Sequence, residues 1–232
     1  LRANIRATEL VVGEMEAQID AAKIGSRRFL ELVKKYSLEK IVNAFHDLMD
    51  YSERMMRDAI RALPDGEYSA TTKIDGYLDD PDPARRELLI KVTLKINGDS
   101  IIVDLSGTAR QVDDKPINMP LVGTVDCSIW LTIRSILLDS VIYGSIPQNS
   151  GLTRPIEIMA PEGSLVNPIF PAPVIARFCP GNQLADTVMK AFAQIVPDKV
   201  SAGIGNLRVV ALSGLRDGNH WVHMEIMEGS YG

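Results

Sequence analysis

The alternation of apolar and polar residues from Leu88 to Leu105 constrains the fold of this chain more than any other feature. Asn97-Gly98 interrupts the alternation and is the preferred pair for a type I′ hairpin turn. Side chains alternate between the two faces of a strand, so the apolar set belongs on one buried face. With Asn97 and Gly98 as loop residues, the register pairs Leu94 with Ile101, Val92 with Val103 and Ile90 with Leu105, and sets Lys91 opposite Asp104. We therefore expect a half-buried antiparallel hairpin in which Asp104 is structural.

Helical and strand patterns fill the rest of the chain. A 3.6-residue apolar period predicts helices over 5–24, 27–36 and 38–63, with Gly25-Ser26 as a stop followed by an N-cap. Further helices are predicted over 125–138 and 183–196, strands over 68–76 and 154–160, and a second hairpin over 207–213 and 220–227. The fold class is α+β, an N-terminal helical segment followed by antiparallel hairpins with packed helices. We expect two domains, a helical segment 1–63 and a mixed domain 64–232.

Composition and charge exclude several functional classes. The chain has 232 residues, of which 46% are hydrophobic and 24% charged, as in a packed globular protein. Its net charge of -5 argues against a general nucleic-acid surface, and no stretch approaches the length of a membrane span. The two cysteines lack Cys-x-x-Cys spacing, which favours a reducing compartment and a cytoplasmic location. Both ends read as cut, so we expect an interior portion of a longer polypeptide.

Several short motifs follow one another along the chain. The richest is Pro-x-Asn-x-Gly-x-x-Arg-Pro-Ile at residues 147–156, followed by Ala-Pro-Glu-Gly-Ser at 160–164 and by Asn167-Pro168. Proline and glycine fix the backbone there, and rigid loops are where sites are usually built. Asp65-Gly66-Glu67-Tyr68, the run from Asp104 to Gln111, and Ile117-Asn118-Met119-Pro120 precede it. In this order and spacing the set resembles the hydantoinase B family, which includes subunits of ATP-dependent hydantoinases, 5-oxoprolinases and ketone carboxylases.

This resemblance implies a function that no motif in the chain shows by itself. It implies a subunit that encloses a cyclic amide such as a hydantoin, while a hydantoinase A-type partner binds ATP and activates the substrate. No Walker A pattern or dinucleotide fingerprint is present in the sequence, which fits an ATP site on the partner. Family members carry their metal-binding His/Asp motifs upstream of the position of Leu1. The resemblance therefore implies ATP and a divalent metal in the full complex, neither bound by this chain, and a hetero-oligomer.

The candidate site residues come from the loops and from the last hairpin. Asn118, Asn149 and Arg154 are predicted to contact substrate because they lie in the motifs that carry the resemblance. Arg177 and Asn182 precede the helix predicted over 183–196, whose N-terminus with Asn182 as cap could hold an anion. His223 and Glu225 share one face of the last strand and are the candidates for acid-base catalysis, with Glu228 as a further candidate. We predict no metal ligands.

Alternatives stay open at each of these positions. The loop could be a tightly turned surface segment, Arg177 a surface arginine beside a capped helix, and His223-Glu225 a structural pair. For the whole chain, a subunit of an acetone or acetophenone carboxylase is the first alternative to ring opening. A scaffold that holds such a complex together without catalysis is the second, and a stand-alone small-molecule binding domain is the third.

Overall fold

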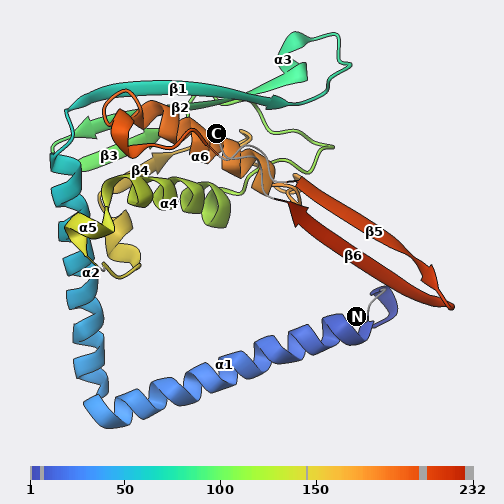
Figure 1. The fold of residues 1–232 in the computed structure, drawn as a ribbon, viewed down its shortest axis with the longest axis horizontal. Coiled ribbons are helices and arrows are strands. Elements are labelled where there is room, and N and C mark those ends of the chain that lie inside the picture. The colour runs from blue at the N-terminus through green and yellow to red at the C-terminus, as the bar shows by residue number, and fades with distance from the viewer. Residues whose placement is uncertain (1, 6–7, 145, 204–207, 228–232) are drawn as a thin grey trace. The chain divides into compact units, whose positions relative to one another are not determined.

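The predicted hairpin lies within a four-stranded sheet in the structure, a computed structural model that describes residues 2–5, 8–144, 146–203 and 208–227. The strands run in the order β1 (Gly66–Asp75), β2 (Glu87–Asn97), β3 (Ser100–Asp104) and β4 (Ile156–Met159). β1, β2 and β3 are antiparallel neighbours, whereas β4 lies parallel to β3. In Figure 1, α4 (Asp126–Leu137) and α6 (Phe178–Phe192) lie on one side of this sheet. The α+β class is confirmed, and the parallel β4 is an addition to the predicted antiparallel hairpins.

The hairpin register differs by two residues from the predicted one. Leu94 pairs with Val103 and Ile96 with Ile101, so the loop residues are Gly98 and Asp99 rather than Asn97 and Gly98. Gly98 has φ 60°, and glycine at the first loop position is typical of a type II′ turn. The Asp99 carboxylate pairs at 2.9 and 2.8 Å with two arginines of α2 (Leu38–Arg61), which holds Asp99 in the loop. A shift of two residues leaves every side chain on its predicted face.

The same shift changes the partner of Asp104. The predicted pair with Lys91 is wrong, and Lys95 Nζ instead lies 2.9 Å from Asp104 Oδ2. The N–H of Ser106 donates to Asp104 Oδ1 at 2.9 Å. The bond from Lys95 and then those from Ser106 lower the pKa of Asp104 to about 2. Asp104 is bonded within its own strand pair and turn, which fits the structural role expected of it.

The hydrophobic core fills the space between the sheet, α4, α6 and the end of α2. In β2 every second residue from Leu88 to Ile96 is buried, and in β3 the same holds for Ile101 and Val103. α6 packs against β1 and β2, and α4 packs against α6. The largest fully buried side chains of this core are Met56, Ile60, Ile90, Leu94, Ile101, Leu105, Met119, Ile129, Ile133, Leu137, Leu152 and Phe192.

Helix α1 (Thr8–Tyr36) is continuous through the predicted stop at Gly25-Ser26, so that prediction is wrong. One glycine costs a helix interior only about 1 kcal/mol relative to alanine, which the other residues of a long helix outweigh. The break comes at Ser37, whose φ is 70°, and α2 follows as predicted. A short turn η1 (Arg2–Asn4) precedes α1.

Helix α6 begins at Phe178, five residues before the predicted start at Gln183. Pro180 does not break it, because the first turn of a helix tolerates a residue without an N–H group. Asn182 consequently lies inside the helix and not at the predicted N-cap, which Arg177 occupies. The remaining short elements are α3 (Pro83–Arg86), η2 (Leu121–Val125), α5 (Ser140–Tyr143), η3 (Ser150–Thr153) and η4 (Pro197–Lys199).

Contacts divide the chain into two units. One comprises Leu1–Asp47 with Val209–Met227, and the other comprises Leu48–Arg208 with the sheet and its helices. The first unit contains the predicted second hairpin, formed by β5 (Arg208–Arg216) and β6 (Asn219–Met227). Asp217 and Gly218 both have positive φ, of 52° and 79°, as a type I′ turn requires. The predicted domains 1–63 and 64–232 concern independent folding, which contacts do not test, and they stay a prediction.

Candidate functional site

The motif at residues 147–156 packs onto α2. Asn149 caps η3 by accepting a bond from the Gly151 N–H at 2.9 Å, and its Nδ2 donates to the hydroxyl of buried Ser52 at 2.9 Å. Gly151 lies so close to α2 that an added Cβ would meet the Met49 carbonyl oxygen at 1.9 Å. The motif needs a glycine here because no side chain fits. Asn149 and Gly151 thus seat η3 on the helix.

Arg154 continues the same contact by ion pairing. Its Nη1 lies 2.7 Å from Asp50 Oδ1 and 2.9 Å from Glu53 Oε2, both on α2. The bond from Arg154, and after it the bond from Arg57, lowers the pKa of Glu53. Asn149 and Arg154 therefore hold α2 with the polar atoms that we expected to contact substrate. Their role in substrate binding stays a prediction to which this geometry adds no support.

Asn118 is fully buried and bonded to backbone groups on both sides of its amide. Its Oδ1 accepts from the Val112 N–H at 2.9 Å, and its Nδ2 donates to the carbonyls of Val112 at 2.7 Å and Pro173 at 2.9 Å. Asn118 thus ties the loop before η2 to the loop before α6. Its predicted contact with substrate has no geometric support either, because these polar atoms are occupied.

The starts of α4 and α6 lie side by side and form the candidate site. An added Cβ on Gly181 would meet Ser128 Oγ at 3.4 Å and Thr124 Cγ2 at 3.6 Å, so the two first turns are in contact. Arg177 lies at this edge, with Cζ 4.5 Å from the centre of the Phe178 ring and Nη1 3.4 Å from the Val174 carbonyl oxygen. Its guanidinium is half-buried and has donors beyond the one that reaches Val174. Arg177 can therefore bind an anionic or carbonyl oxygen.

The backbone at the start of α6 offers less than we expected. The N–H groups of Arg177, Cys179 and Gly181 donate to the carbonyls of Val174, Ala176 and Arg177, and Pro180 has no N–H. An anion site of free helix amides with Asn182 as cap is therefore not what the structure forms. Arg177 supplies the donors of this edge by its side chain instead.

Exposed apolar side chains stand on the segments that lead into the two helices. Phe170 is 94% exposed and Ile175 is 76% exposed on the way into α6, and Val122 is 82% exposed in η2 before α4. Phe178 itself is exposed beside Arg177. Sequence analysis did not single out these residues, although bulky apolar residues between prolines are unusual for a solvated loop. Together with Arg177 they offer apolar contacts and a fork of donors to a small ring.

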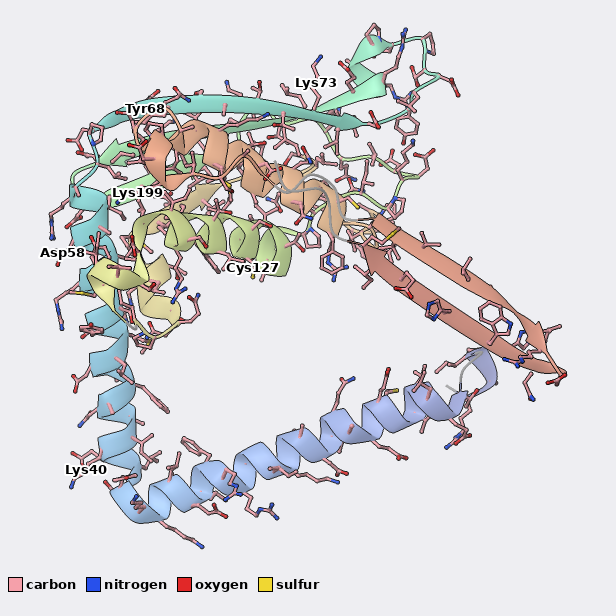
Figure 2. The ribbon with its side chains drawn as sticks, viewed as in Figure 1. Lys40, Asp58, Tyr68, Lys73, Cys127 and Lys199 are labelled. Atoms are coloured by element: carbon pink, nitrogen blue, oxygen red, sulfur yellow. The ribbon has the colours of Figure 1, made fainter. Side chains whose placement is uncertain are left out.

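Cys127 lies at the start of α4, where Figure 2 labels it. Burial raises the pKa of the Cys127 thiol, and the neighbouring Asp126 carboxylate raises it further. Asp126 accepts from the N–H groups of Gly123 and Cys127 at 2.7 and 2.5 Å, which fixes the turn into α4. A thiol held in its neutral form is a poor nucleophile, so the geometry does not favour covalent catalysis by Cys127.

His223 and Glu225 form the expected pair on β6. His223 Nε2 lies 2.7 Å from Glu225 Oε1, and both side chains are exposed on one face of the strand. They belong to the first unit, whereas Asn118, Asn149, Arg154, Arg177 and Asn182 belong to the second. Their assignment as acid and base stays a prediction. Glu228, the further candidate, lies outside the described residues.

A hollow of ≈ 900 Å³ lies elsewhere on the second unit, near α3. Figure 2 shows Lys73 at that end of β1. Two of its cationic residues are already paired, Lys73 with Glu87 and Arg85 with Asp80. The predicted site residues do not line it; the lining is Lys73, Tyr77, Pro83, Ala84, Arg85, Glu87, Leu88, Leu89, Ala109, Arg110, Gln111, Val112, Asp113, Gly163 and Ile169.

Two searches of the described residues bear on cofactors and membranes. Within the described ranges no group of three or more His, Cys, Asp or Glu side chains is arranged to hold a metal ion. The expectation that metal ligands lie outside this chain stays a prediction. No helix in the same ranges has the length and apolar character needed to cross a membrane.

Comparison with known proteins places the chain among its relatives. The family model described as hydantoinase B/oxoprolinase matches residues 1–232. The chain belongs to the hydantoinase B/oxoprolinase family. It is 63% identical over its whole length to the B subunit of a "Putative D-/L-hydantoinase" from Pseudomonas sp. (strain NS671), and spans 39% of that protein. The expected family resemblance is confirmed.

Two solved structures of this fold are similar to the chain. The ATP-dependent caprolactamase of Pseudomonas jessenii superposes on 96% of the chain with a TM-score of 0.79 and 28% identity, and the chain covers 37% of it. A nucleotide-free acetone carboxylase superposes on 99% of the chain with a TM-score of 0.80, and the chain covers 32% of it. Its 14% identity extends the likeness to the fold alone.

Proposed function

We propose that this chain is part of the B-type subunit of an ATP-dependent enzyme that opens a cyclic amide ring, with a hydantoin as substrate. The observation that carries the proposal is the 63% identity to the B subunit of a hydantoinase along every part of the chain. The 28% identity to a caprolactamase supports the same reaction class, because a lactam is also a cyclic amide. An unstrained amide resists water, so ATP drives the ring opening by transferring a phosphoryl group to the substrate.

The edge between α4 and α6 supports a role in holding this substrate. A hydantoin has carbonyl oxygens that gain negative charge when the ring carbon is attacked, and a guanidinium fork stabilises such an oxygen. Arg177 provides that fork, and the Phe178 ring beneath it limits its movement. Exposed Val122, Phe170 and Ile175 supply apolar contacts that exclude bulk water from an activated intermediate. Asn182 stays a candidate contact as an inner residue of the first helical turns.

His223 and Glu225 remain the proposed pair for proton transfer. Ring opening needs a base that takes a proton from water and an acid that returns one to the departing nitrogen. An imidazole 2.7 Å from a carboxylate can do both, because the carboxylate orients the ring and stabilises its protonated form. His223→Gln should lower turnover by about 100-fold or more if the pair moves protons. An unchanged rate would assign it a structural role.

The partner in this proposal is an ATP-binding subunit of the hydantoinase A type. The name of the 63% identical relative, a B subunit, supports a hetero-oligomer. ATP and a divalent metal would bind to that partner or to parts of the protein beyond this chain. Purifying the full-length protein with and without the partner, and measuring ADP release on adding hydantoin, tests this division. ATP hydrolysis by the full-length protein alone would overturn it.

The substrate class needs its own assay. The assembled enzyme should release ADP with a hydantoin in buffer free of bicarbonate, and open-ring product should form in equal amount. A ketone carboxylase would release ADP only with a ketone and bicarbonate, and that result would favour the alternative. Assembly with the partner but no effect of any substrate-edge variant would favour a scaffold.

Arg177→Ala separates function from stability at the proposed edge. A half-exposed arginine contributes under about 0.5 kcal/mol to folding, whereas loss of a donor to a developing anion costs about 100-fold in turnover. Arg177→Lys keeps the charge without the fork and should fall between. Arg54→Ala on the exposed face of α2 is the matched control. Equal effects of Arg177→Ala and Arg54→Ala on turnover would remove Arg177 from the site.

A further inference from the structure

Helix α1 presents an apolar seam that nothing in the described part of the chain covers. Not one of its 29 residues is buried there, although Ile19 is 56% and Tyr36 is 47% exposed. The seam follows an alternating three- and four-residue spacing over the whole helix, which is the heptad pattern of a coiled coil. Its members are Val12, Met15, Ile19, Ala22, Ser26, Phe29, Val33 and Tyr36. A seam of this length is typical of a helix that packs along another helix.

The charges of α1 are divided between its two halves. Residues 8–22 contain Glu9, Glu14, Glu16 and Asp20 and no lysine or arginine. Residues 23–36 contain Lys23, Arg27, Arg28, Lys34 and Lys35, with Glu31 as the one acid. The dipole of the helix itself favours such charges only within the first and last turn. Glu14, Glu16, Asp20 and Lys23 lie beyond that reach, so the division needs another explanation.

We infer that α1 pairs antiparallel with α1 of a second copy of this chain. A two-fold axis between residues 20 and 21 brings each acidic half against the basic half of the partner. The seam residues then form layers in which Ile19 faces Ala22, Met15 faces Ser26 and Val12 faces Phe29 of the other copy. A parallel pair would instead set acidic half beside acidic half. The charge pattern therefore selects both the partner and the direction.

One charge pair tests the register. In the antiparallel pair Glu16 and Lys23 flank the seam at equivalent positions and face each other across the axis, twice per dimer. Lys23 contacts Asp20 on its own helix at 3.0 Å, but both side chains are about two-thirds exposed or more. Such a surface pair is weak and exchanges readily. Glu16 and Lys23 can therefore meet without breaking a buried contact.

Charge reversal gives a test with an internal rescue. Glu16→Lys sets two lysines against each other on both sides of the axis, and Lys23→Glu sets two glutamates there. Each variant should weaken self-association by roughly tenfold, since two exposed pairs change from attraction to repulsion. Mixing the two variants should restore association as a heterodimer, because the lysine introduced at position 16 of one chain then meets the native lysine's replacement, a glutamate, at position 23 of the other. Sedimentation velocity of the purified chains and of the mixture measures this.

A second pair of variants tests the seam itself. Ile19→Asp places a charge in the seam and should abolish association, whereas Ile24→Asp changes a similarly exposed isoleucine on the far side of α1 and should leave it intact. Circular dichroism shows that both remain helical. A wild-type chain that is monomeric at the highest concentration reached would overturn the inference. So would equal effects of the two aspartates, or a mixture of charge variants no stronger than each alone.

Discussion

Replacing Asn118 tests whether this motif residue serves the scaffold. Asn118→Ala removes three bonds of 2.7 to 2.9 Å and leaves the Val112 N–H and the Val112 and Pro173 carbonyls without them in a buried site. Each such bond contributes about 1 kcal/mol net, and an unsatisfied buried group costs about 1 to 3 kcal/mol. We therefore expect a loss of about 3 to 5 kcal/mol in the free energy of unfolding, a large part of the stability of an ordinary domain.

Urea unfolding monitored by tryptophan fluorescence measures this loss. The chain has two tryptophans, and a Trp221→Phe background leaves Trp130 of α4, beside the core, as the probe. Asn167→Ala is the matched control, because half-buried Asn167 gives one side-chain bond of 3.0 Å, to the Ala160 carbonyl. The control should cost about 1 kcal/mol. If Asn118→Ala cost no more than Asn167→Ala, its amide would not be locked in the core and could serve a ligand.

Three further predictions concern pH, ion pairing and metal. The pKa of Asp104 is lowered to about 2, so its contribution to stability is present above about pH 4 and is lost as the pH falls toward 2; urea unfolding should show a loss of no more than about 2 kcal/mol across that range, which Asp104→Asn should flatten. Arg154→Met should cost about 1 kcal/mol, more than Arg28→Met at the exposed pair with Glu31, and the difference should shrink at high salt because it comes from pairing with Asp50 and Glu53. Elemental analysis of the dialysed chain should find no stoichiometric zinc, manganese or iron, and a full equivalent of one of them would place the metal ligands within it.

The register of the central hairpin shows what a sequence can and cannot predict. Alternation has a period of two, so it predicts which face each residue of 88–105 occupies, and those faces are correct. It does not distinguish two registers that differ by two residues. The choice depends on Asp99, which pairs with Arg57 and Arg61 about forty positions earlier in the chain. Such a contact between distant segments is invisible to a local pattern.

The candidate site was predicted less well for the same reason. The exposed pair His223–Glu225 follows from alternation along one strand, and the structure brings the two residues together. The burial of Asn118 depends on Pro173, and the use of Arg154 depends on Asp50 and Glu53. Asn182 was misplaced because Pro180 begins a helix as readily as it ends one. Local signals indicated where polar groups gather, and distant contacts decided how they are used.

This distribution of contacts separates the scaffold from the part that chooses a substrate. Asn118, Asn149 and Arg154 come from the motifs that carry the family resemblance, and each spends its side chain on the chain itself. The edge with side chains turned outward is the segment 169–178, which ends in Arg177 and Phe178. A scaffold held by buried amides and ion pairs can keep its shape while such an edge varies. That division accounts for one fold in proteins as different as a caprolactamase and an acetone carboxylase. Substitutions at 169–178 should therefore change which ring is accepted, whereas substitutions in the motifs should first change stability.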